Sequence, residues 1–329
     1  MPTAGFRVAV LGATGAVGAE ILQVLDERRF PVRELYACAS ADSEGDELEF
    51  RDGSVKVTRP RAEQLGDCDL VLCAAPGLLP SLLPGISRGR ARVVDVTGAL
   101  ELDPEVPLWL PGVSALPEPR PRFVAVPRGV TAGLALSLAP FVRAGLVRRV
   151  SAVTLESASG AGIAGVGELT DHTVQVLNRM SGERSESEVF SQSLAFDCLP
   201  QIGELEPGGE TDSEHRLRDV LRRLLANAEL AIELTRVRMP TLGGSLAAVH
   251  VELARPLSQD EAAALWRGQP GVGLLGEELP TPRGSLGHDD AAVGRVRAAG
   301  DRLAFVVALN DLRLGAALGV VGAAEALTA

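Results

Sequence analysis

The sequence predicts an α/β protein that combines a Rossmann-type doubly wound parallel sheet with an α+β second domain built on a mixed or antiparallel sheet. Three observations support this prediction. Short apolar strands alternate with helix-like stretches up to about Thr131, and longer strands with alternating apolar and polar residues follow. The chain has 329 residues, of which 46% are hydrophobic and 23% are charged, so it can bury two substantial cores.

The first part of the chain repeats a strand–helix unit. Its strands are expected at Arg7–Leu11, Glu34–Ala39, Leu70–Ala75, Val93–Val96 and Phe123–Val126, and its helices include Val17–Glu27 and Leu79–Arg88. This order is typical of a parallel sheet, because each helix returns the chain to the edge where the next strand begins.

The second part mixes strands and helices less regularly. Strands are expected at Arg149–Ser157, Glu229–Met239 and Ser245–Leu253, helices at Glu168–Met180 and Leu217–Asn227, a polar loop at 180–193, and a small-residue helix from Asp311. The expected domains are therefore residues 1–128, residues 129–310 and a C-terminal segment at 311–329.

Charge and cysteine usage exclude several classes of protein. The formal net charge of −11 and the 3% aromatic content argue against nucleic-acid binding. We expect no membrane partner, because the N-terminus lacks a signal peptide and the apolar runs are too short to span a bilayer. Four cysteines without a C-x-x-C pair predict reduced thiols in the cytoplasm, and no disulfide or metal site.

The stretch VAVLGATGAVGAEIL consists of a strand, a G-x-x-G-x-x-G loop and the start of a helix. Such a loop permits a tight turn and a close approach of the backbone to a pyrophosphate at the helix N-terminus. The alternative is a turn that serves only helix packing. The predicted cofactor contacts in this loop are Gly12, Thr14, Gly15, Ala16, Val17 and Gly18.

The acidic stretch ACASADSEGDE follows the second strand, where a dinucleotide fold meets the adenosine ribose. We assign Ser40 and Asp42 to this part of the site. A carboxylate there accepts from a ribose hydroxyl but repels a 2′-phosphate, so NAD is favoured over NADP. A solvated acidic loop that holds no cofactor is the alternative.

A second strand-to-helix turn lies in FVAVPRGVTAGLALSLAPF. Enzymes often hold a nucleophile at such a turn, since the helix N-terminus stabilises an anion. This turn offers Arg128, Gly129, Val130 and Thr131, with neither cysteine nor serine, and Thr131 is expected to cap the helix.

Several motifs occur in an order that resembles the aspartate-semialdehyde dehydrogenase family, in particular its USG-1-like paralogues. They are GATGAVG, ASADSEG, DVTGALELDPEVPLWLPGVS, SASGAG, TRVRMPTLGGSLAAVHVE and NDLRLGAA. The resemblance implies a homodimer in which residues 129–310 carry most of the interface and the C-terminal helix packs on the first domain. It also implies reduction of an aspartyl phosphate through a cysteine thioester, with NADPH as hydride donor and a histidine as acid/base.

The family's functional residues carry over incompletely. The nucleophilic cysteine corresponds to Gly129, and the glutamine before S-G-A-G corresponds to Glu156. The substrate-binding arginine is kept as Arg238. The catalytic histidine corresponds to Ser245, or to Gly244 if one gap is allowed.

The remaining family positions also differ. The phosphate-binding arginine corresponds to Glu101, and the arginine that binds the 2′-phosphate corresponds to Asp42. Arg216 replaces a substrate-binding lysine, and Ser213 stands where a substrate-binding glutamate is expected. Asn310 and Asp311 stand in swapped order at the nicotinamide end, and P-E-V-N is matched by Gly112 and Ser114 in PGVS.

These replacements predict that the family's reaction is lost. Glycine cannot form a thioester, and serine cannot relay a proton near neutral pH as imidazole does. Glu101 in place of an arginine repels a phosphorylated substrate. Cys38 and Cys198 are interpreted as core residues, Cys68 as an inert residue near the surface, and Cys73 as a buried small hydrophobe in preference to a nucleophile. His172 is interpreted as a polar helix position and His250 as structural, and none of His172, His215, His250 and His288 is paired at metal-ligand spacing. Arg238 is expected either to pair with Glu156 or to bind an anion.

Three functions are therefore open. The first is a nucleotide-binding dimer that has lost the family's reaction and binds a small molecule. The second is an active NAD(P)-dependent semialdehyde or oxo-acid dehydrogenase that transfers hydride without a covalent intermediate. The third is a structural partner whose nucleotide site is vestigial and holds no cofactor.

Overall fold

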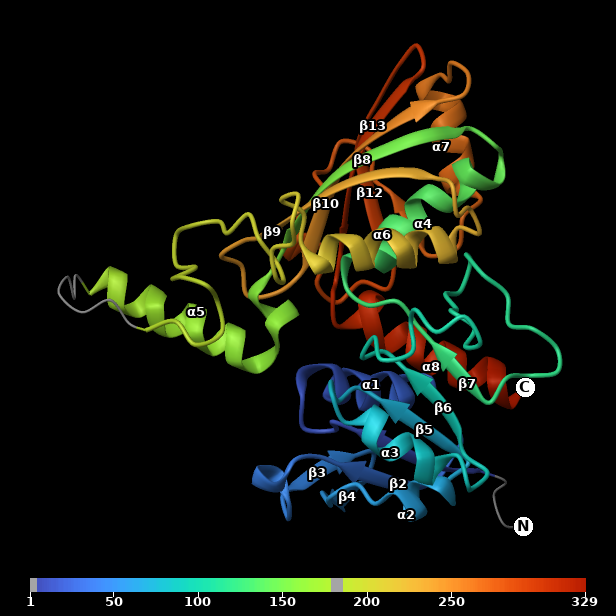
Figure 1. The fold of residues 1–329 in the computed structure, drawn as a ribbon, viewed down its shortest axis with the longest axis vertical. Helices are drawn as coiled ribbons and strands as arrows, with labels where there is room; N and C mark the ends of the chain where they lie inside the picture. Colours follow the sequence, from blue (N-terminus) through green and yellow to red (C-terminus); the bar gives the residue numbers. More distant parts are fainter. Residues whose placement is uncertain (1–4, 179–185) are drawn as a thin grey trace. The chain divides into compact units, whose positions relative to one another are not determined.

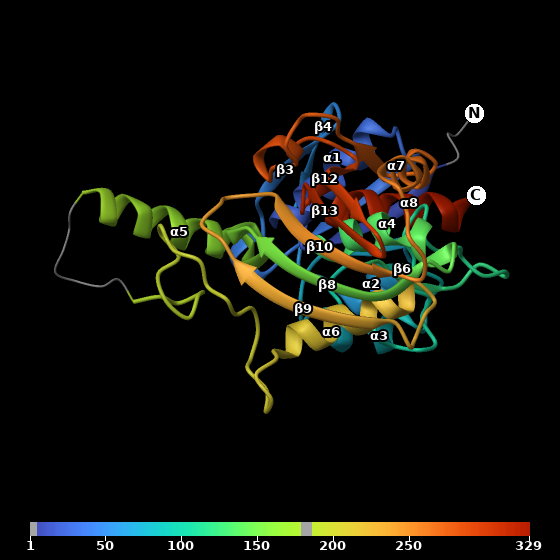
Figure 2. The same ribbon diagram turned by 90° about the horizontal axis from the view of Figure 1, so that it is seen from above.

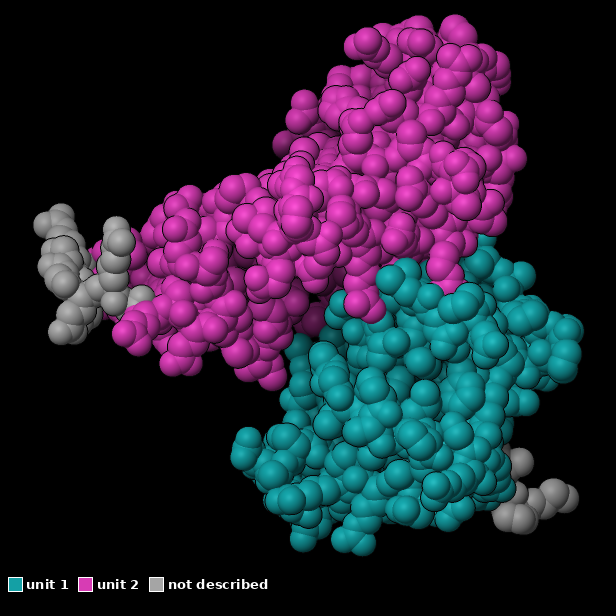
Figure 3. All heavy atoms as spheres, viewed as in Figure 1, with its two compact units in different colours: residues 1–128, 316–329 teal, residues 129–315 magenta. Residues whose placement is uncertain are grey.

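The computed structural model describes residues 5–178 and 186–329, which form two compact units. Unit 1 comprises residues 1–128 and 316–329, and unit 2 comprises residues 129–315 (Figure 3). Each unit has its own sheet (Figure 1). Part of the helix predicted at Glu168–Met180, and of the loop predicted at 180–193, lies outside the described residues.

Unit 1 is built on a parallel five-stranded sheet in the order β2-β1-β5-β6-β7. Its strands are β1 (Phe6–Leu11), β2 (Val32–Cys38), β5 (Leu70–Cys73), β6 (Arg92–Asp95) and β7 (Phe123–Ala125). Its helices are α1 (Ala16–Glu27), α2 (Ala62–Gly66), α3 (Leu79–Ile86) and the C-terminal α8 (Leu318–Thr328), which contacts α1 and β6. The hairpin β3 (Glu47–Phe50) and β4 (Gly53–Lys56) lies beside β2.

Unit 2 is built on a mixed six-stranded sheet in the order β11-β12-β13-β10-β8-β9. Its strands are β8 (Val147–Glu156), β9 (Ala231–Arg238), β10 (Ser245–Leu253), β11 (Val272–Leu274), β12 (Ala291–Ala299) and β13 (Arg302–Leu309). β10 is antiparallel to both β8 and β13, whereas β8 pairs in parallel with β9. The predicted fold class, a parallel sheet followed by a mixed sheet, is therefore confirmed.

The helices of unit 2 pack against this sheet with one exception. They are α4 (Val130–Arg143), α5 (Gly162–Leu177), α6 (Asp212–Leu224) and α7 (Gln259–Arg267). Almost all of α4 is buried between α6, α7 and the sheet. Trp266 anchors this core by packing edge-on against Phe141 and Phe305 and by donating from its indole N–H to the Ser137 carbonyl over 2.9 Å. Only α5 extends away from the sheet (Figures 1 and 2).

The starts of four helices differ from the prediction, and the first difference is that α5 begins at Gly162 and not at Glu168. Thr131 does not cap α4, because Gly129 is the cap residue and no side chain bonds to the first turn. α6 begins at Asp212, earlier than predicted, because Thr211 and Glu214 form a capping box. The C-terminal helix begins at Leu318, after a π-helical turn at Arg313–Ala317.

Gly18 determines how closely α1 packs on the glycine loop. A Cβ atom at Gly18 would lie 2.0 Å from the Gly12 carbonyl oxygen, which is backbone and cannot move aside. Gly12 itself has a φ of 82°, a conformation that favours glycine. The close approach of these two glycines therefore fixes the position of α1.

We predict that Gly18→Ala lowers the free energy of unfolding by at least about 2 kcal/mol, because the added methyl group overlaps the loop backbone. The control is Gly167→Ala in α5, where a Cβ meets no atom within 4 Å. This control should be neutral or gain up to about 1 kcal/mol of helix propensity. Denaturant unfolding measures both, and equal stabilities of the two variants would contradict the packing role of Gly18.

Candidate functional site

The turn before α4 in unit 2 carries no reactive side chain. Gly129 has φ 57° and ψ −140°, and its N–H donates to the Gly315 carbonyl over 2.7 Å. A Cβ atom at Gly315 would lie 2.9 Å from the Gly129 Cα, so the two backbones touch. A Cβ at Gly129 would meet no atom within 4 Å. Backbone conformation, and not lack of space, is therefore what disfavours a side chain at Gly129.

Glu156 lies buried at the end of β8 and is paired with Arg236. Its Oε1 accepts from Nε of Arg236 at 2.8 Å, and its Oε2 accepts from Nη2 at 2.7 Å. Thr154 donates to Oε1 as well, over 2.8 Å. Burial opposes ionisation of Glu156, but the charge and hydrogen bonds of Arg236 outweigh it and hold the pKa of Glu156 below its usual range. Of the two alternatives for Arg238, the ion pair with Glu156 is not the one formed. Glu156 lies opposite Arg238 in the strand register, but its carboxylate bonds to Arg236, two residues earlier on β9.

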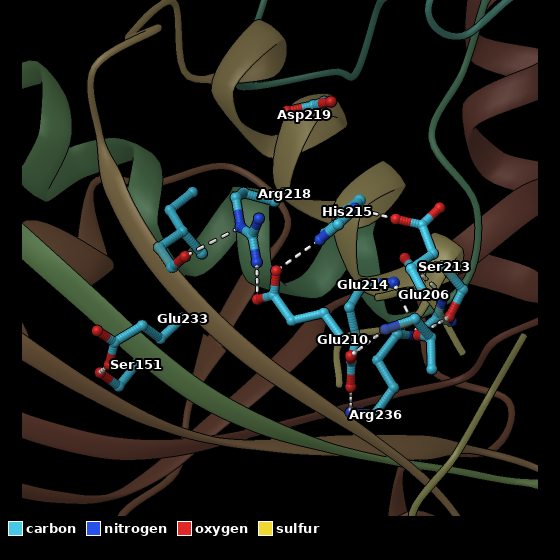
Figure 4. Close-up of polar contacts among 12 residues, drawn as sticks. Ser151, Glu206, Glu210, Ser213, Glu214, His215, Arg218, Asp219, Glu233 and Arg236 are labelled. Carbon is cyan, nitrogen blue, oxygen red and sulfur yellow. Dashed lines mark hydrogen bonds and ion pairs between the residues drawn. The ribbon is translucent and has the colours of Figure 1, made fainter. Parts of the chain in front are cut away.

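Arg236 also joins β9 to the start of α6. Its backbone N–H donates to Glu214 over 2.9 Å, and its guanidinium donates to the Ser213 carbonyl over 3.3 Å (Figure 4). The other Glu214 oxygen accepts from the Thr211 N–H over 2.8 Å as part of the capping box. Ser213, which stands at the family's substrate-binding position, and its neighbour Glu214 are thus engaged in holding α6.

The outer face of α6 carries a separate polar cluster. Glu210 accepts from Arg218 and contacts His215, whose other ring nitrogen lies 2.9 Å from Glu206 (Figure 4). Arg216 lies half-buried on the same helix. The cluster is half-exposed and its charges pair with one another, so it stabilises the helix surface.

Arg238 is buried at the end of β9 with most of its donors unused. Its Nη1 donates to the Ser157 carbonyl over 2.6 Å, and the guanidinium makes no other hydrogen bond with the described residues. Gly160 leaves the space for it, because a Cβ there would lie 2.5 Å from Nη1. Burial lowers the pKa of Arg238, whereas the charge of Glu156 raises it. A guanidinium with free N–H groups in a buried setting is suited to binding a carboxylate.

Asp311 follows β13 and is surrounded by serine hydroxyls. Its Oδ2 accepts from Ser157 at 2.8 Å and lies 3.4 Å from Ser159, and these two hydroxyls are 2.7 Å apart. Asp311 is only 8% exposed, and its Oδ1 makes no hydrogen bond of good geometry with the described residues. Burial raises the pKa of Asp311 to about 6, although the hydroxyls of Ser245 and Ser157 oppose the rise.

The structure therefore brings several predicted positions of unit 2 together. Arg238 and Asp311 both hydrogen-bond to Ser157, which directly follows Glu156, and the Ser245 hydroxyl acts on Asp311. Gly129 contacts the turn after Asp311 through Gly315. Sequence reasoning missed Arg236, Ser157 and Ser159. Residues two apart on a strand share a face, so the spacing of Arg236 and Arg238 was a usable signal.

The glycine loop of unit 1 connects to the acidic stretch after β2. The N–H groups of Gly12 and Ala13 both donate to the Cys38 carbonyl, over 2.7 and 3.0 Å. Gly15 precedes α1, whose first residues are Ala16 and Val17, and Thr14 Oγ1 lies 3.3 Å from the Ser43 hydroxyl. A 3-10 turn spans Ala41–Ser43; Ser40 directly precedes it, and the exposed Asp42 lies within it. The two predicted halves of the cofactor site are thus adjacent within unit 1.

Glu101 is buried in unit 1 and lies near Arg128. A Cβ placed on Gly98 would lie 3.1 Å from Glu101 Oε1 and 3.2 Å from Nη2 of Arg128. The Glu101 carboxylate and the Arg128 guanidinium therefore both lie next to Gly98. The family resemblance implies a phosphate-binding arginine at the position of Glu101. The positive charge of Arg128 is thereby offset by a neighbouring carboxylate.

No cysteine in the described part of the chain has the environment of a nucleophile. Cys38, Cys68 and Cys73 are buried in unit 1, and burial raises the pKa of Cys68 to about 11 and that of Cys73 to about 12. Cys198 is exposed. His172 is buried on α5, and its Nδ1 has no partner among residues 5–178 and 186–329. The same residues contain no group of three side chains that could hold a metal ion, and none of their helices is long and apolar enough to cross a membrane.

Comparisons with known proteins agree with this architecture. Residues 7–117 match the NAD binding domain of semialdehyde dehydrogenases, and residues 138–314 match their dimerisation domain. The aspartate-semialdehyde dehydrogenase of Prochlorococcus marinus is 35% identical over 99% of this chain and 97% of its own length. Aspartate-semialdehyde dehydrogenase 2 of Vibrio cholerae is 34% identical, over 98% and 97%. The crystal structure of aspartate semialdehyde dehydrogenase II from Vibrio cholerae superposes with a TM-score of 0.92 at 33% identity, with 98% of each chain covered.

We predict that Arg236→Met lowers the free energy of unfolding by about 3–5 kcal/mol at neutral pH, because it leaves Glu156 charged and buried without its partner. The control is Arg149→Met, which breaks an exposed pair with Glu233 on the same two strands. The control should cost less than about 1 kcal/mol. Denaturant unfolding compares the two variants. Equal losses in the free energy of unfolding would show that the buried Glu156 pair contributes no more to stability than an exposed pair.

A second prediction concerns Asp311 and pH. Its pKa is about 6 in the folded protein, against an ordinary value of 3.8, so the folded state binds this proton more tightly than the unfolded state does. The burial cost is therefore fully present above about pH 6, and it disappears as the pH falls toward the ordinary value. Asp311→Asn should raise the free energy of unfolding near pH 8 by up to about 3 kcal/mol, and the gain should shrink near pH 4.

Thermal unfolding of both proteins across this pH range measures the effect of Asp311→Asn. Asp289→Asn is the control, because Asp289 pairs with Arg313 at a half-exposed site. Its effect should stay below about 1 kcal/mol. A gain for Asp311→Asn that does not vary with pH would exclude a charged, buried Asp311 as its source.

Proposed function

This chain belongs to the aspartate-semialdehyde dehydrogenase family, and from that premise we propose that it is a cytoplasmic, NAD(P)-binding homodimer that no longer performs the family's acylating reductive dephosphorylation. The observation that carries the proposal is Gly129. It stands at the nucleophile position with a φ of 57°, and its N–H is bonded to Gly315. Without a thiol at this turn no thioester forms, and hydride transfer to a thioester has no substrate.

The proton-transfer position supports the same proposal. Ser245 stands where the family resemblance implies a histidine, and it is 2% exposed beside Asp311. A hydroxyl does not exchange protons near neutral pH as imidazole does. Nucleophile and acid/base are therefore both replaced, which is the pattern expected of a USG-1-like paralogue.

Arg238 supports retention of a binding function. It is buried, it has free donors, and it stands at the position of the family's substrate-binding arginine. We propose a small carboxylate as its ligand, because a guanidinium offers a carboxylate two parallel hydrogen bonds. Glu101 replaces the phosphate-binding arginine that the family resemblance implies, and this replacement argues against a phosphorylated ligand.

The proposed cofactor contacts are the glycine loop together with Ser40 and Asp42. The NAD binding domain that matches residues 7–117 supports this placement. NAD is proposed over NADP, because an exposed carboxylate at Asp42 repels a 2′-phosphate. The dimer is supported by the match to a dimerisation domain and by exposed apolar side chains on α5 at Ile163, Val174, Val176 and Leu177.

One observation favours a second function, that of an NAD(P)-dependent oxo-acid dehydrogenase without a covalent intermediate. Such a reaction requires a carboxylate anchor and a proton donor, which Arg238 and the partly protonated Asp311 could supply. This reaction would proceed without phosphate and without a thiol, so assays distinguish it from the family's reaction.

The test is an assay of the wild-type protein with aspartate semialdehyde, phosphate and NAD or NADP, beside the Vibrio cholerae relative as positive control. We expect kcat/KM to be at least about ten-thousand-fold below that of the relative, as for loss of a nucleophile. Calorimetry in parallel should show saturable binding of NAD(H).

Two outcomes would overturn parts of this proposal. Phosphate-dependent turnover that a thiol reagent abolishes would show that another cysteine replaces the missing one, and the loss of the reaction would be refuted. Absence of binding of either dinucleotide would refute the cofactor and favour a vestigial nucleotide site. Oxidation of NADH by oxo acids without phosphate would support the second function.

A further inference from the structure

We propose that the Arg238 site binds a small carboxylate together with a proton, and that Asp311 is the group that takes up this proton. The inference rests on the proposed function of Arg238 as a carboxylate anchor and goes beyond it by assigning a proton-linked partner. It depends on how the four charged groups at the ends of β8, β9 and β13 are paired.

Two of these four groups neutralise each other directly. Glu156 accepts both of its arginine hydrogen bonds from Arg236, over 2.8 and 2.7 Å, and its third comes from Thr154. This pair is therefore closed, and Glu156 has little capacity left for a ligand. The remaining two groups, Arg238 and Asp311, have opposite charges, but no hydrogen bond or ion pair joins them in the described part of the chain.

Ser157 separates Arg238 from Asp311 while contacting both. Its carbonyl accepts from Nη1 of Arg238 at 2.6 Å, and its hydroxyl donates to Oδ2 of Asp311 at 2.8 Å. Each charged group keeps unused capacity: the other N–H groups of Arg238, and Oδ1 of Asp311, lack partners among the described residues. The unused donors of Arg238 and the unused acceptor Oδ1 of Asp311 thus belong to side chains that both bond to the buried Ser157.

A bound carboxylate would disturb this balance. It would neutralise Arg238 but place a second negative charge beside Asp311, where burial leaves little solvent to screen the repulsion. Two carboxylates in such a setting share one proton, and the apparent pKa of the pair rises. A proton on Oδ1, the oxygen without a partner, could be donated to the ligand carboxylate.

The surroundings of Asp311 allow either protonation state. Serine hydroxyls on the turn after β8 and at the start of β10 can rotate to donate to a carboxylate or accept from a carboxylic acid. The ionisable groups that act on Asp311 are Glu156, which raises its pKa, and Arg238, which lowers it. Because burial already raises the pKa of Asp311 to about 6, a modest further rise on binding reaches neutral pH.

The experiment is calorimetric titration of the intact protein with lactate, a carboxylate that stays ionised throughout, from about pH 5.5 to about pH 8.5. We expect affinity to fall about fivefold between pH 6 and pH 8 and to level off above pH 8, which corresponds to a rise of about one unit in the pKa of Asp311 on binding. Titrations at pH 7 in two buffers of different ionisation enthalpy should show net proton uptake.

Three variants sharpen the test. Asp311→Asn should bind lactate with an affinity that no longer depends on pH, and Asp289→Asn, which removes a carboxylate paired with Arg313, should keep the wild-type profile. Ser245→Ala removes a hydroxyl that favours ionised Asp311, so it should move the fall in affinity to higher pH. This last variant keeps the inference testable if Asp311→Asn does not fold.

The outcomes separate this inference from the proposed function. Lactate binding of constant affinity across the range, an unchanged profile in Asp311→Asn, or an unmoved profile in Ser245→Ala would each overturn the role of Asp311 alone. Absence of saturable lactate binding would overturn Arg238 as anchor, and the inference with it. The loss of the acylating reaction is decided by the phosphate-dependent assay and by neither of these results.

Discussion

Arg236 and Arg238 lie two residues apart on β9, half-buried and buried, and charge compensation of this pair determines how the ends of the unit 2 strands are arranged. Arg236 takes both oxygens of Glu156, which leaves Arg238 with only the Ser157 carbonyl. The second carboxylate, Asp311, comes from the end of β13 and is linked to Arg238 through Ser157. Burial of charge is costly without a partner, so the position of each of these side chains depends on the others.

The same constraint extends to the turn before α4. Asn310 accepts from the N–H groups of Leu312 and Arg313, over 3.2 and 3.3 Å, which fixes the π-helical turn directly after Asp311. Gly315 in that turn receives the N–H of Gly129. The backbone contact that fills this turn is therefore connected, residue by residue, to the buried charges. A cysteine restored at Gly129 would need a different φ, and so a change in this connected segment.

Much of the fold could be predicted from the sequence because it is encoded locally. The alternation of residues on β8 and β10, and the glycine spacing after β1, act over a few positions. The sequence also contains a signal for the start of α6, because Thr211 and Glu214 have the spacing of a capping box. The prediction missed this start because it relied on the apolar pattern that begins at Leu217. The short strand β11 carries little apolar periodicity, so its pairing with β12 is not specified by its own residues.

The site was less predictable because its pairings depend on the packing of distant strands. Alignment to a family identified Glu156, Arg238 and Ser245, yet the partner of Glu156 is set by the parallel register of β8 and β9 and by the rotamer of Arg236. Asp311 is 152 to 154 positions from the serines that donate to it. No local pattern specifies such a contact.

The energetics of Asp311 bear on whether the site is merely structural. An ionised carboxylate at this depth destabilises the folded protein above about pH 6, whereas an amide of the same shape would accept from the same serine hydroxyls without a charge. A site with only a packing role would therefore be more stable with asparagine. The carboxyl group differs from the amide in one further respect, which is that it can change its charge when a ligand binds. Its presence beside an arginine with free donors is thus better explained by binding than by packing.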